Sequence, residues 1–156
     1  MMIYTLPFQE QVDMALAKPF QSEYIEVKAR TSVESKKRKN SLYIYPGTLW
    51  CGIEDIADNE DALGRLDDVD SCCRNHDHCD RSVSAHTTKF GYTNEMSTTV
   101  SDCECDTTFY NCLKAVTRNE NDAKVVGRIY FNFKKMPCLQ FSADGTVPTL
   151  EHSPKF

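Results

Sequence analysis

The chain of 156 residues lacks several features that would define its class directly. No stretch approaches the roughly 20 consecutive apolar residues of a membrane-spanning helix. The first 20 residues lack the basic start and continuous apolar segment of a secretory signal peptide, because Gln9, Glu10, Gln11 and Asp13 interrupt them. An excess of basic residues is also missing, since the formal net charge is -5, and this argues against a general nucleic-acid binder.

Cysteine is absent from the first 50 residues, yet eight cysteines lie between Cys51 and Cys138. An even, clustered set favours an oxidised, secreted and extracellular domain stapled by disulfides, and it disfavours a free nucleophilic thiol. The competing interpretation, a zinc module, fits poorly, because the spacings are C-C, C-x-C and single residues rather than paired C-x-x-C units. A G-x-S-x-G motif is absent as well, so a serine hydrolase of that type is unsupported.

The cysteine distribution predicts three segments. We expect residues 1–40 to be a poorly ordered leader or propeptide-like segment, residues 41–147 to form the stapled domain, and residues 148–156 to be a tail whose end, EHSPKF (151–156), is frayed. The first segment ends near the basic run Lys36 to Lys39, which suits either a solvated stretch or a processing site for basic-residue proteases.

Two segments predict helices. Residues 68–84 (DVDSCCRNHDHCDRSVS) carry Asp70 and Ser71 as plausible N-caps. Residues 101–116 (SDCECDTTFYNCLKAV) begin with an S-x-x-E capping box whose serine is Ser101.

The remaining patterns predict short extended elements. Residues 84–96 predict a loop or hairpin with a turn at Gly91. In residues 128–133 (RIYFNF) apolar side chains alternate and indicate a strand with one face formed by Ile129, Phe131 and Phe133. The sequence ADGT, residues 143–146, is typical of a hairpin turn.

Cysteine spacing links the two predicted helices. Cys72 and Cys79 are seven residues apart, and so are Cys105 and Cys112. Seven residues is about two helical turns, so each pair lies on one face, and the helices can be stapled twice, either antiparallel or parallel. His76 lies between the first two cysteines and therefore on the stapled face.

This placement favours a general base. In the antiparallel arrangement Asp106 falls within about a turn of His76, where a carboxylate can hold one imidazole nitrogen and leave the other facing outward. The hydroxyl of Tyr130 is a candidate donor to Asp106. A helical histidine is more often a surface or packing residue, and we expect His78 to be exposed. His86 and His152 have no nameable partner in the sequence.

The neighbouring Asp77 suits a hard cation. It points about 100° away from His76 around the helix, beside the base rather than at it. Calcium takes six to eight oxygens, including backbone carbonyls, and the loop from Trp50 to Glu54 (WCGIE) is a candidate source because Gly52 permits an unusual backbone course. A cation there would polarise an ester carbonyl while His76 activates a water.

Taken together, six motifs resemble the bee-venom-type, or group III, secreted phospholipase A2 family: YPGTLWCG, LGR, DSCCRNHDHCD, YTNE, CECDTTFYNCL and GRIYFNF. The resemblance runs from about Ile44 to Cys138. It implies a mainly α, disulfide-rich fold with two long antiparallel helices cross-linked by disulfides, a calcium-binding loop and a small β-hairpin. It also implies calcium-dependent hydrolysis of the sn-2 ester of glycerophospholipids at a membrane or micelle surface, by a protein that we expect to be monomeric.

The resemblance implies the following site roles. His76 is the general base, Asp106 orients it, and Asp77 is the calcium carboxylate, with backbone carbonyls from Trp50, Gly52 and Glu54. The implied disulfides are Cys51–Cys73, Cys72–Cys112, Cys79–Cys105 and Cys103–Cys138, which use all eight cysteines.

One position departs from the family pattern. The calcium loop of the family usually reads W-C-G-x-G, and Glu54 stands at the second glycine. Glu54 either adopts the dihedral angles of glycine and offers its carbonyl, or supplies its side-chain carboxylate instead. The same departure keeps open an alternative function, a non-catalytic phospholipase-like toxin or receptor-binding protein with a weakened calcium site.

Overall fold

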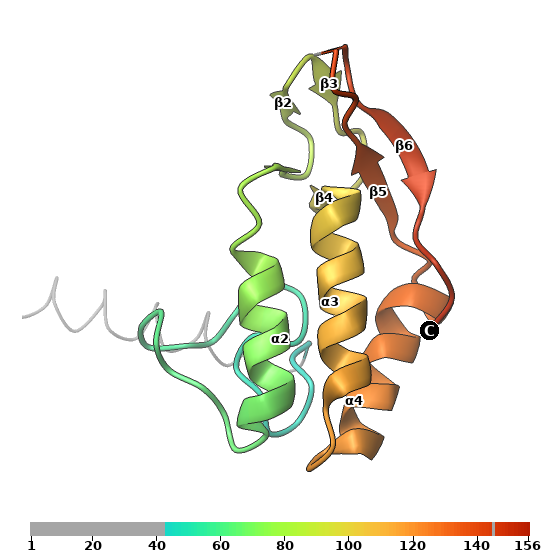
Figure 1. Ribbon diagram of the computed structural model, residues 1–156. Helices are drawn as coiled ribbons and strands as arrows, with labels where there is room; N and C mark the ends of the chain where they lie inside the picture. Colours follow the sequence, from blue (N-terminus) through green and yellow to red (C-terminus); the bar gives the residue numbers. More distant parts are fainter. Residues whose placement is uncertain (1–42, 145) are drawn as a thin grey trace, which may run out of the picture. The chain divides into compact units, whose positions relative to one another are not determined.

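The computed structural model describes residues 43–144 and 146–156, which belong to one compact unit, Tyr43–Phe156 (Figure 1). The expected leader, residues 1–40, and Gly145 of the expected turn lie outside the described residues. Within the described part of the chain, no helix combines the length and the apolar character needed to cross a bilayer.

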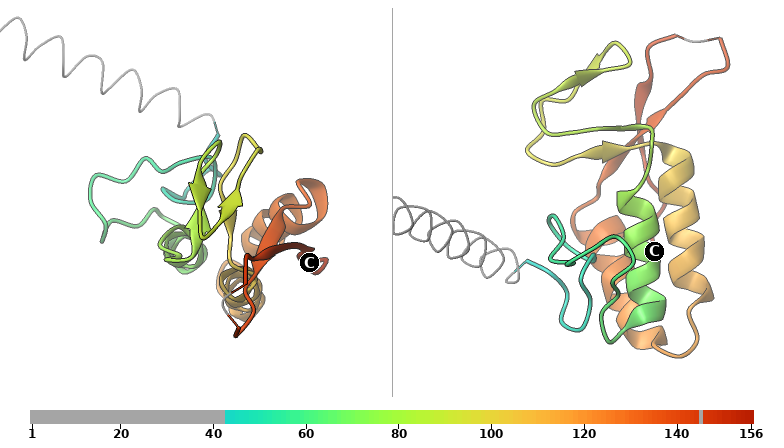
Figure 2. Two further views of the ribbon diagram at one scale, coloured as in Figure 1. Left: turned by 90° about the horizontal axis from the view of Figure 1, so that it is seen from above. Right: turned by 90° about the vertical axis from the view of Figure 1, so that its left-hand side faces the viewer.

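Two helices that lie side by side organise the domain, α2 (Asp67–Asp77) and α3 (Cys103–Ala115) (Figures 1 and 2). They run antiparallel, and the bridges Cys72–Cys112 and Cys79–Cys105 join them about two turns apart. Spacing alone left the direction open, and the structure has the antiparallel arrangement.

All eight cysteines are bridged, in the same four pairs that the resemblance implies. The pairs are Cys51–Cys73, Cys72–Cys112, Cys79–Cys105 and Cys103–Cys138. The described residues include every cysteine of the chain and none of them is free, so no thiolate remains for a zinc module.

The start and end of α2 differ from the prediction. The helix begins at Asp67, and neither Asp70 nor Ser71 is its N-cap. The helix has no side-chain cap. Acidic residues in its first turn stabilise this end instead, because they interact favourably with the positive end of the helix dipole. It ends at Asp77 rather than near residue 84, because the chain closes a tighter turn in which the Cys79 N–H donates to the His76 carbonyl over 3.1 Å.

The N-cap of α3 is also one residue away from the prediction. The Asp102 carboxylate, not the Ser101 hydroxyl, accepts the Glu104 N–H at 2.9 Å. Ser101 instead belongs to strand β4 (Val100–Ser101), where it pairs with Ser82 of β1 (Ser82–Val83). The predicted capping box is therefore wrong, because strand pairing already occupies its serine.

The predicted strand at residues 128–133 is wrong. Helix α4 (Glu120–Gly127) continues directly into a π-helix, η1 (Arg128–Phe133). The Lys134 N–H donates to the Ile129 carbonyl over 2.9 Å, a hydrogen bond that spans five residues. Alternation did not mark a buried face, because only Phe131 is buried, whereas Phe133 is 85% exposed.

Three short antiparallel ladders complete the fold. β1 pairs with β4, and β2 (Thr88–Lys89) pairs with β3 (Tyr92–Thr93) in a hairpin whose turn contains Gly91 at φ +75°, as predicted. β5 (Pro137–Gln140) pairs with β6 (Thr149–His152). The predicted turn at residues 143–146 lies in the connection between these two strands, so the sequence located this hairpin correctly.

The segment after β6 is packed against the domain, and the expectation of a frayed end is wrong. The Phe156 ring lies parallel to the Phe131 ring, with the centroids 6.0 Å apart, and contacts Tyr110 edge-on. The side chain of Asn132 forms two hydrogen bonds with the backbone of Phe156, of 2.8 and 3.1 Å. We call residues 149–156 the C-terminal strap.

Candidate functional site

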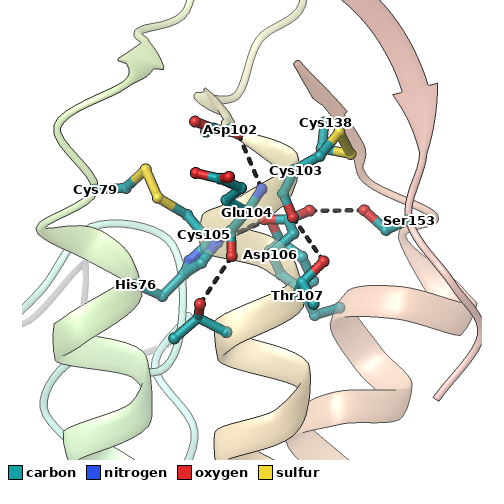
Figure 3. A network of polar contacts seen from close by, with 12 residues as sticks. His76, Cys79, Asp102, Cys103, Glu104, Cys105, Asp106, Thr107, Cys138 and Ser153 are labelled. Atoms are coloured by element: carbon teal, nitrogen blue, oxygen red, sulfur yellow. Dashed lines mark hydrogen bonds and ion pairs between the residues drawn. A yellow bond between two sulfur atoms is a disulfide. The ribbon is translucent and has the colours of Figure 1, made fainter. Parts of the chain in front are cut away.

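The centre of the site is a contact between the two stapled helices. The His76 Nε2 atom of α2 lies 2.7 Å from the Asp106 Oδ1 atom of α3 (Figure 3). The side chain of His76 is 9% exposed and that of Asp106 is 1% exposed. With Nε2 donating to the carboxylate, Nδ1 is the nitrogen left to accept a proton, which is the arrangement that an oriented general base requires.

Asp106 receives two further hydrogen bonds. The Tyr130 hydroxyl of η1 donates to Oδ1 over 3.1 Å, and the Ser153 hydroxyl of the C-terminal strap donates to Oδ2 over 2.7 Å. A buried carboxylate is stable when such donors satisfy it. Burial, followed by the nearby charge of Asp106, raises the pKa of Tyr130 well above its usual value, so this phenol stays protonated as a donor.

Aromatic rings hold the imidazole in place. The His76 ring stacks on Phe109, with centroids 4.6 Å apart and planes at 27°, and the Tyr130 ring meets it edge-on at 5.2 Å. Phe109 is buried in the main core cluster. The imidazole therefore has little freedom to rotate away from Asp106.

The base faces an open cleft of about 580 Å³. Asp77 lines this cleft together with His76, with Gly52, Ile53 and Glu54 of the loop, and with the following Asp55. Trp50 lines a smaller adjoining cavity of about 80 Å³, which His76, Asp77 and Gly52 also line. The structure thus brings His76 and the candidate cation ligands to two adjoining cavities, whereas Asp106 lines neither cavity and contacts His76.

A buried carboxylate holds the loop against α2. Asp70 is fully buried and accepts the backbone N–H groups of Leu49 and Trp50 over 2.9 Å, and that of Gly64 over 2.7 Å. The loop is also crowded at Gly52, where a Cβ atom would lie 2.1 Å from the Tyr43 carbonyl oxygen, so no larger residue fits. These contacts fix the course of the backbone from Trp50 onward.

The donors around Asp77 suit calcium better than a softer metal. Among residues 43–144 and 146–156 no three His, Cys, Asp or Glu side chains cluster as a metal cage, so backbone carbonyls would have to contribute. Gly52, Glu54 and Asp77 line one cleft and offer only oxygen ligands, which is what calcium prefers. The Trp50 carbonyl already accepts the Gly52 N–H over 3.0 Å and retains its second lone pair.

The comparison with known proteins now decides the family. The family model described as Phospholipase A2 matches residues 44–142. The chain belongs to the bee-venom-type, or group III, phospholipase A2 family. This membership makes it a lipid esterase of the phospholipase A2 class, with a disulfide-rich fold in which the family match spans α2, α3, α4 and β5.

Individual phospholipase A2 relatives agree with this family. The chain is 43% identical over 98 residues to the phospholipase A2 isozymes PA3A/PA3B/PA5 of Heloderma suspectum, covering 63% of this chain and 67% of the relative. It is 46% identical over 100 residues to a phospholipase A2 of Apis dorsata, covering 62% and 72%. It is 37% identical over 103 residues to the group 3 secretory phospholipase A2 of Homo sapiens, covering 66% of this chain and 20% of that longer protein.

The position that departs from the phospholipase A2 pattern has the backbone of a glycine. Glu54 adopts φ +59°, in the left-handed region that favours glycine. Of the two possibilities that the sequence left open, the observed backbone satisfies the first, a glutamate with the dihedral angle of glycine. Glu54 keeps that angle at a conformational cost of about 1 kcal/mol.

The other three histidines of this phospholipase A2 are exposed. His78 is exposed, as predicted, and its ring lies 5.3 Å from the ring of Trp50. His86 and His152 are exposed on the β-sheet side of the domain.

Two residues of the site were missed by sequence reasoning. Ser153 is 47 residues from Asp106 in the chain, and no spacing rule connects them. Asp70 was interpreted as an N-cap, although its place one turn before Cys73 could have indicated an inward-facing carboxylate.

Proposed function

We propose that this protein catalyses the calcium-dependent hydrolysis of the sn-2 acyl ester of glycerophospholipids, releasing a fatty acid and a lysophospholipid. The observation that carries the proposal is the 2.7 Å contact between His76 and Asp106 at the edge of the cleft that Asp77 lines. Family membership supports the reaction class.

The reaction assigns a step to each residue. Asp106 holds the imidazole through Nε2, and Nδ1 of His76 accepts a proton from a water molecule in the cleft. The water oxygen forms a bond to the ester carbonyl carbon, the bond from that carbon to the sn-2 oxygen breaks, and His76 returns the proton to the leaving oxygen. Asp77 and the carbonyls of Trp50, Gly52 and Glu54 would hold calcium, whose positive charge would stabilise the negative charge that develops on the ester carbonyl oxygen.

We further propose that the partner of the protein is a phospholipid membrane or micelle surface and that it acts there as a monomer. Two exposed apolar side chains line the cavities, Ile53 at 46% and Ile129 at 42% exposure. Phe133 of η1, next to Lys134 in the chain, is 85% exposed. Lys134 lines both cavities and adds positive charge that suits an anionic headgroup region. The formal net charge of -5 argues against nucleic acid.

Secretion completes the proposal. Four disulfides suit an oxidising compartment, and the human relative is named a secretory enzyme.

The experiment measures fatty-acid release from phosphatidylcholine vesicles, with calcium and with chelator. Wild type should hydrolyse vesicles only with calcium, and His76→Gln should lower the rate by about 10³-fold or more without unfolding. The matched control is His86→Gln, an exposed histidine outside the cleft, which should leave the rate unchanged. Wild-type activity that persists in chelator would contradict calcium dependence, and an active His76→Gln variant would contradict the role of the base.

A second candidate function, a non-catalytic toxin or receptor-binding protein, rests on Glu54 at the usual glycine position. A calcium titration separates the two. Absence of binding at millimolar calcium, the weak range of extracellular sites, together with no ester release, would favour the binding protein.

A further inference from the structure

The C-terminal strap contributes a residue to the site from beyond the segment that the family model matches. That match ends at residue 142, whereas Ser153 lies eleven positions further along. We propose that Ser153 is a positioning residue, which holds the Asp106 carboxylate so that His76 stays aligned for proton transfer. This proposal deepens the proposed function and rests on it.

The two oxygens of the Asp106 carboxylate have different hydrogen-bond partners. Oδ1 lies 2.7 Å from His76, whereas Oδ2 accepts the Ser153 hydroxyl at 2.7 Å (Figure 3). Oδ1 also accepts the Tyr130 hydroxyl at 3.1 Å. Both oxygens of a carboxylate that is 1% exposed must be satisfied, and Ser153 is the partner of the second one. Without this bond, the Asp106 carboxylate can rotate about its last side-chain torsion. The rotation would weaken the hydrogen bond between Asp106 Oδ1 and His76 Nε2.

The C-terminal strap is anchored on both sides of Ser153, and these contacts fix the position of the Ser153 hydroxyl beside Asp106. Before it, β6 pairs with β5, and Cys138 of β5 is bridged to Cys103 at the start of α3. After it, Phe156 is hydrogen-bonded to Asn132 and packed on η1, as described above. A loose segment could not hold a serine at 2.7 Å, and these anchors provide the rigidity that a positioning residue requires.

The test compares Ser153→Ala with wild type on a short-chain phospholipid below its micellar concentration, so that binding to an interface does not enter. We expect kcat to fall about 5- to 10-fold, with KM changed by less than about 2-fold. Ser153→Thr, which keeps the hydroxyl, should recover at least half of the lost kcat. The matched control is Thr149→Ala, at an exposed position of the same strap, which should leave both constants unchanged.

A double-mutant cycle separates positioning from a general effect on the fold. In an Asp106→Asn background, Ser153→Ala should change kcat by less than about 2-fold, because the carboxylate through which it acts is gone. An equal fall in both backgrounds, or an unchanged kcat in Ser153→Ala, would overturn the proposal.

A spectroscopic readout keeps this test distinct from that of the proposed function. In ¹⁵N-histidine-labelled protein, with and without calcium, the His76 Nε2 proton should exchange with solvent faster in Ser153→Ala than in wild type. An inactive wild type that still shows this difference would contradict the proposed reaction while supporting the role of Ser153. An exchange rate identical to that of wild type would refute the role of Ser153 whatever the activity.

Discussion

The ring of Phe156 lies directly over Gly127, where a Cβ atom would be 2.6 Å from the ring carbons. Gly127 is the last residue of α4, with helical dihedral angles, so the glycine is required by the neighbouring ring and not by its own backbone. The end of the C-terminal strap is thus seated on a surface that only the smallest residue allows.

The contact between Gly127 and Phe156 predicts that the effect of Gly127→Ala on stability changes sign when Phe156 is removed. Gly127→Ala should destabilise the domain by about 1–2 kcal/mol, because the methyl group displaces the Phe156 ring. In a Phe156→Ala background the same substitution should stabilise it by up to about 1 kcal/mol, because alanine favours the helix. Thermal unfolding of the four variants with intact disulfides measures the cycle, and additive effects would contradict the contact.

Asp70 should be the most sensitive carboxylate outside the His76–Asp106 pair. Asp70→Asn should cost about 2–4 kcal/mol, because an amide offers one acceptor oxygen to three N–H donors and turns its NH₂ group toward the rest. Denaturant unfolding measures the loss, and calcium affinity should fall as the loop loosens. The control Asp67→Asn removes an exposed carboxylate paired with Arg118, and should cost less than about 1 kcal/mol.

The raised pKa of Asp77 predicts how the folding stability of the calcium-free protein depends on pH. Burial, partly opposed by His76 and reinforced by Asp55, raises the pKa of Asp77 from 3.8 to about 7. The folded state then binds more protons than the unfolded state between these values, so stability is lost as pH rises through this window. The residue as a whole is exposed, so water screens the charge, and we expect an effect of about 1 kcal/mol or less.

Melting temperatures of wild type and Asp77→Asn at pH 5 and pH 8 check this expectation. Asp77→Asn should be relatively more stable at pH 8 in chelator, and millimolar calcium should reverse the order by stabilising wild type alone. Asp80→Asn is the control for loss of an exposed charge on the same segment. If the melting temperatures of wild type and Asp77→Asn differ by the same amount at pH 5 and pH 8, the raised pKa of Asp77 is contradicted.

Substitutions of Glu54 show whether its backbone carbonyl or its side-chain carboxylate binds calcium. If Glu54 contributes only its carbonyl, Glu54→Gly should keep calcium affinity and change stability by less than about 1 kcal/mol, since relief of the left-handed φ offsets the entropy of glycine. Isothermal titration with calcium measures this directly. A loss of affinity of about 10-fold or more in both Glu54→Gly and Glu54→Gln would assign the ligand to the carboxylate instead.

Local spacing predicted the parts of the site that lie on helices. The interval between Cys72 and Cys79 was enough to place His76 on the stapled face, because helical periodicity relates these positions rigidly. It also placed Asp106 near the base once an antiparallel arrangement was assumed, whereas the Tyr130 donor was proposed without any spacing argument.

The sequence could not predict features that depend on distant contacts. The Ser153 bond requires β6 to pair with β5 in one register, and the turn signal at residues 143–146 predicts a hairpin but not that register. The alternation in residues 128–133 was misleading because the chain enters η1 as a continuation of α4, and Phe131 alone faces the core. Asp70 was assigned to a helix start because an aspartate before a helical pattern has two uses, a cap or a buried acceptor, and only the folded loop distinguishes them.

The two bridges between α2 and α3 have a consequence beyond holding the helices together. Cys72–Cys112 and Cys79–Cys105 close a small covalent ring that consists of residues 72–79 and 105–112 and contains both His76 and Asp106. In the oxidised chain these two side chains keep a high effective concentration for one another even when the surrounding domain unfolds. The Cys51–Cys73 bridge ties the loop that carries the oxygen ligands to the neighbour of Cys72, so the oxidised chain keeps this loop close to the histidine–aspartate pair as well. Unfolding without reduction should therefore leave all parts of the site near one another, and refolding should recover the site much faster than it does from the reduced chain.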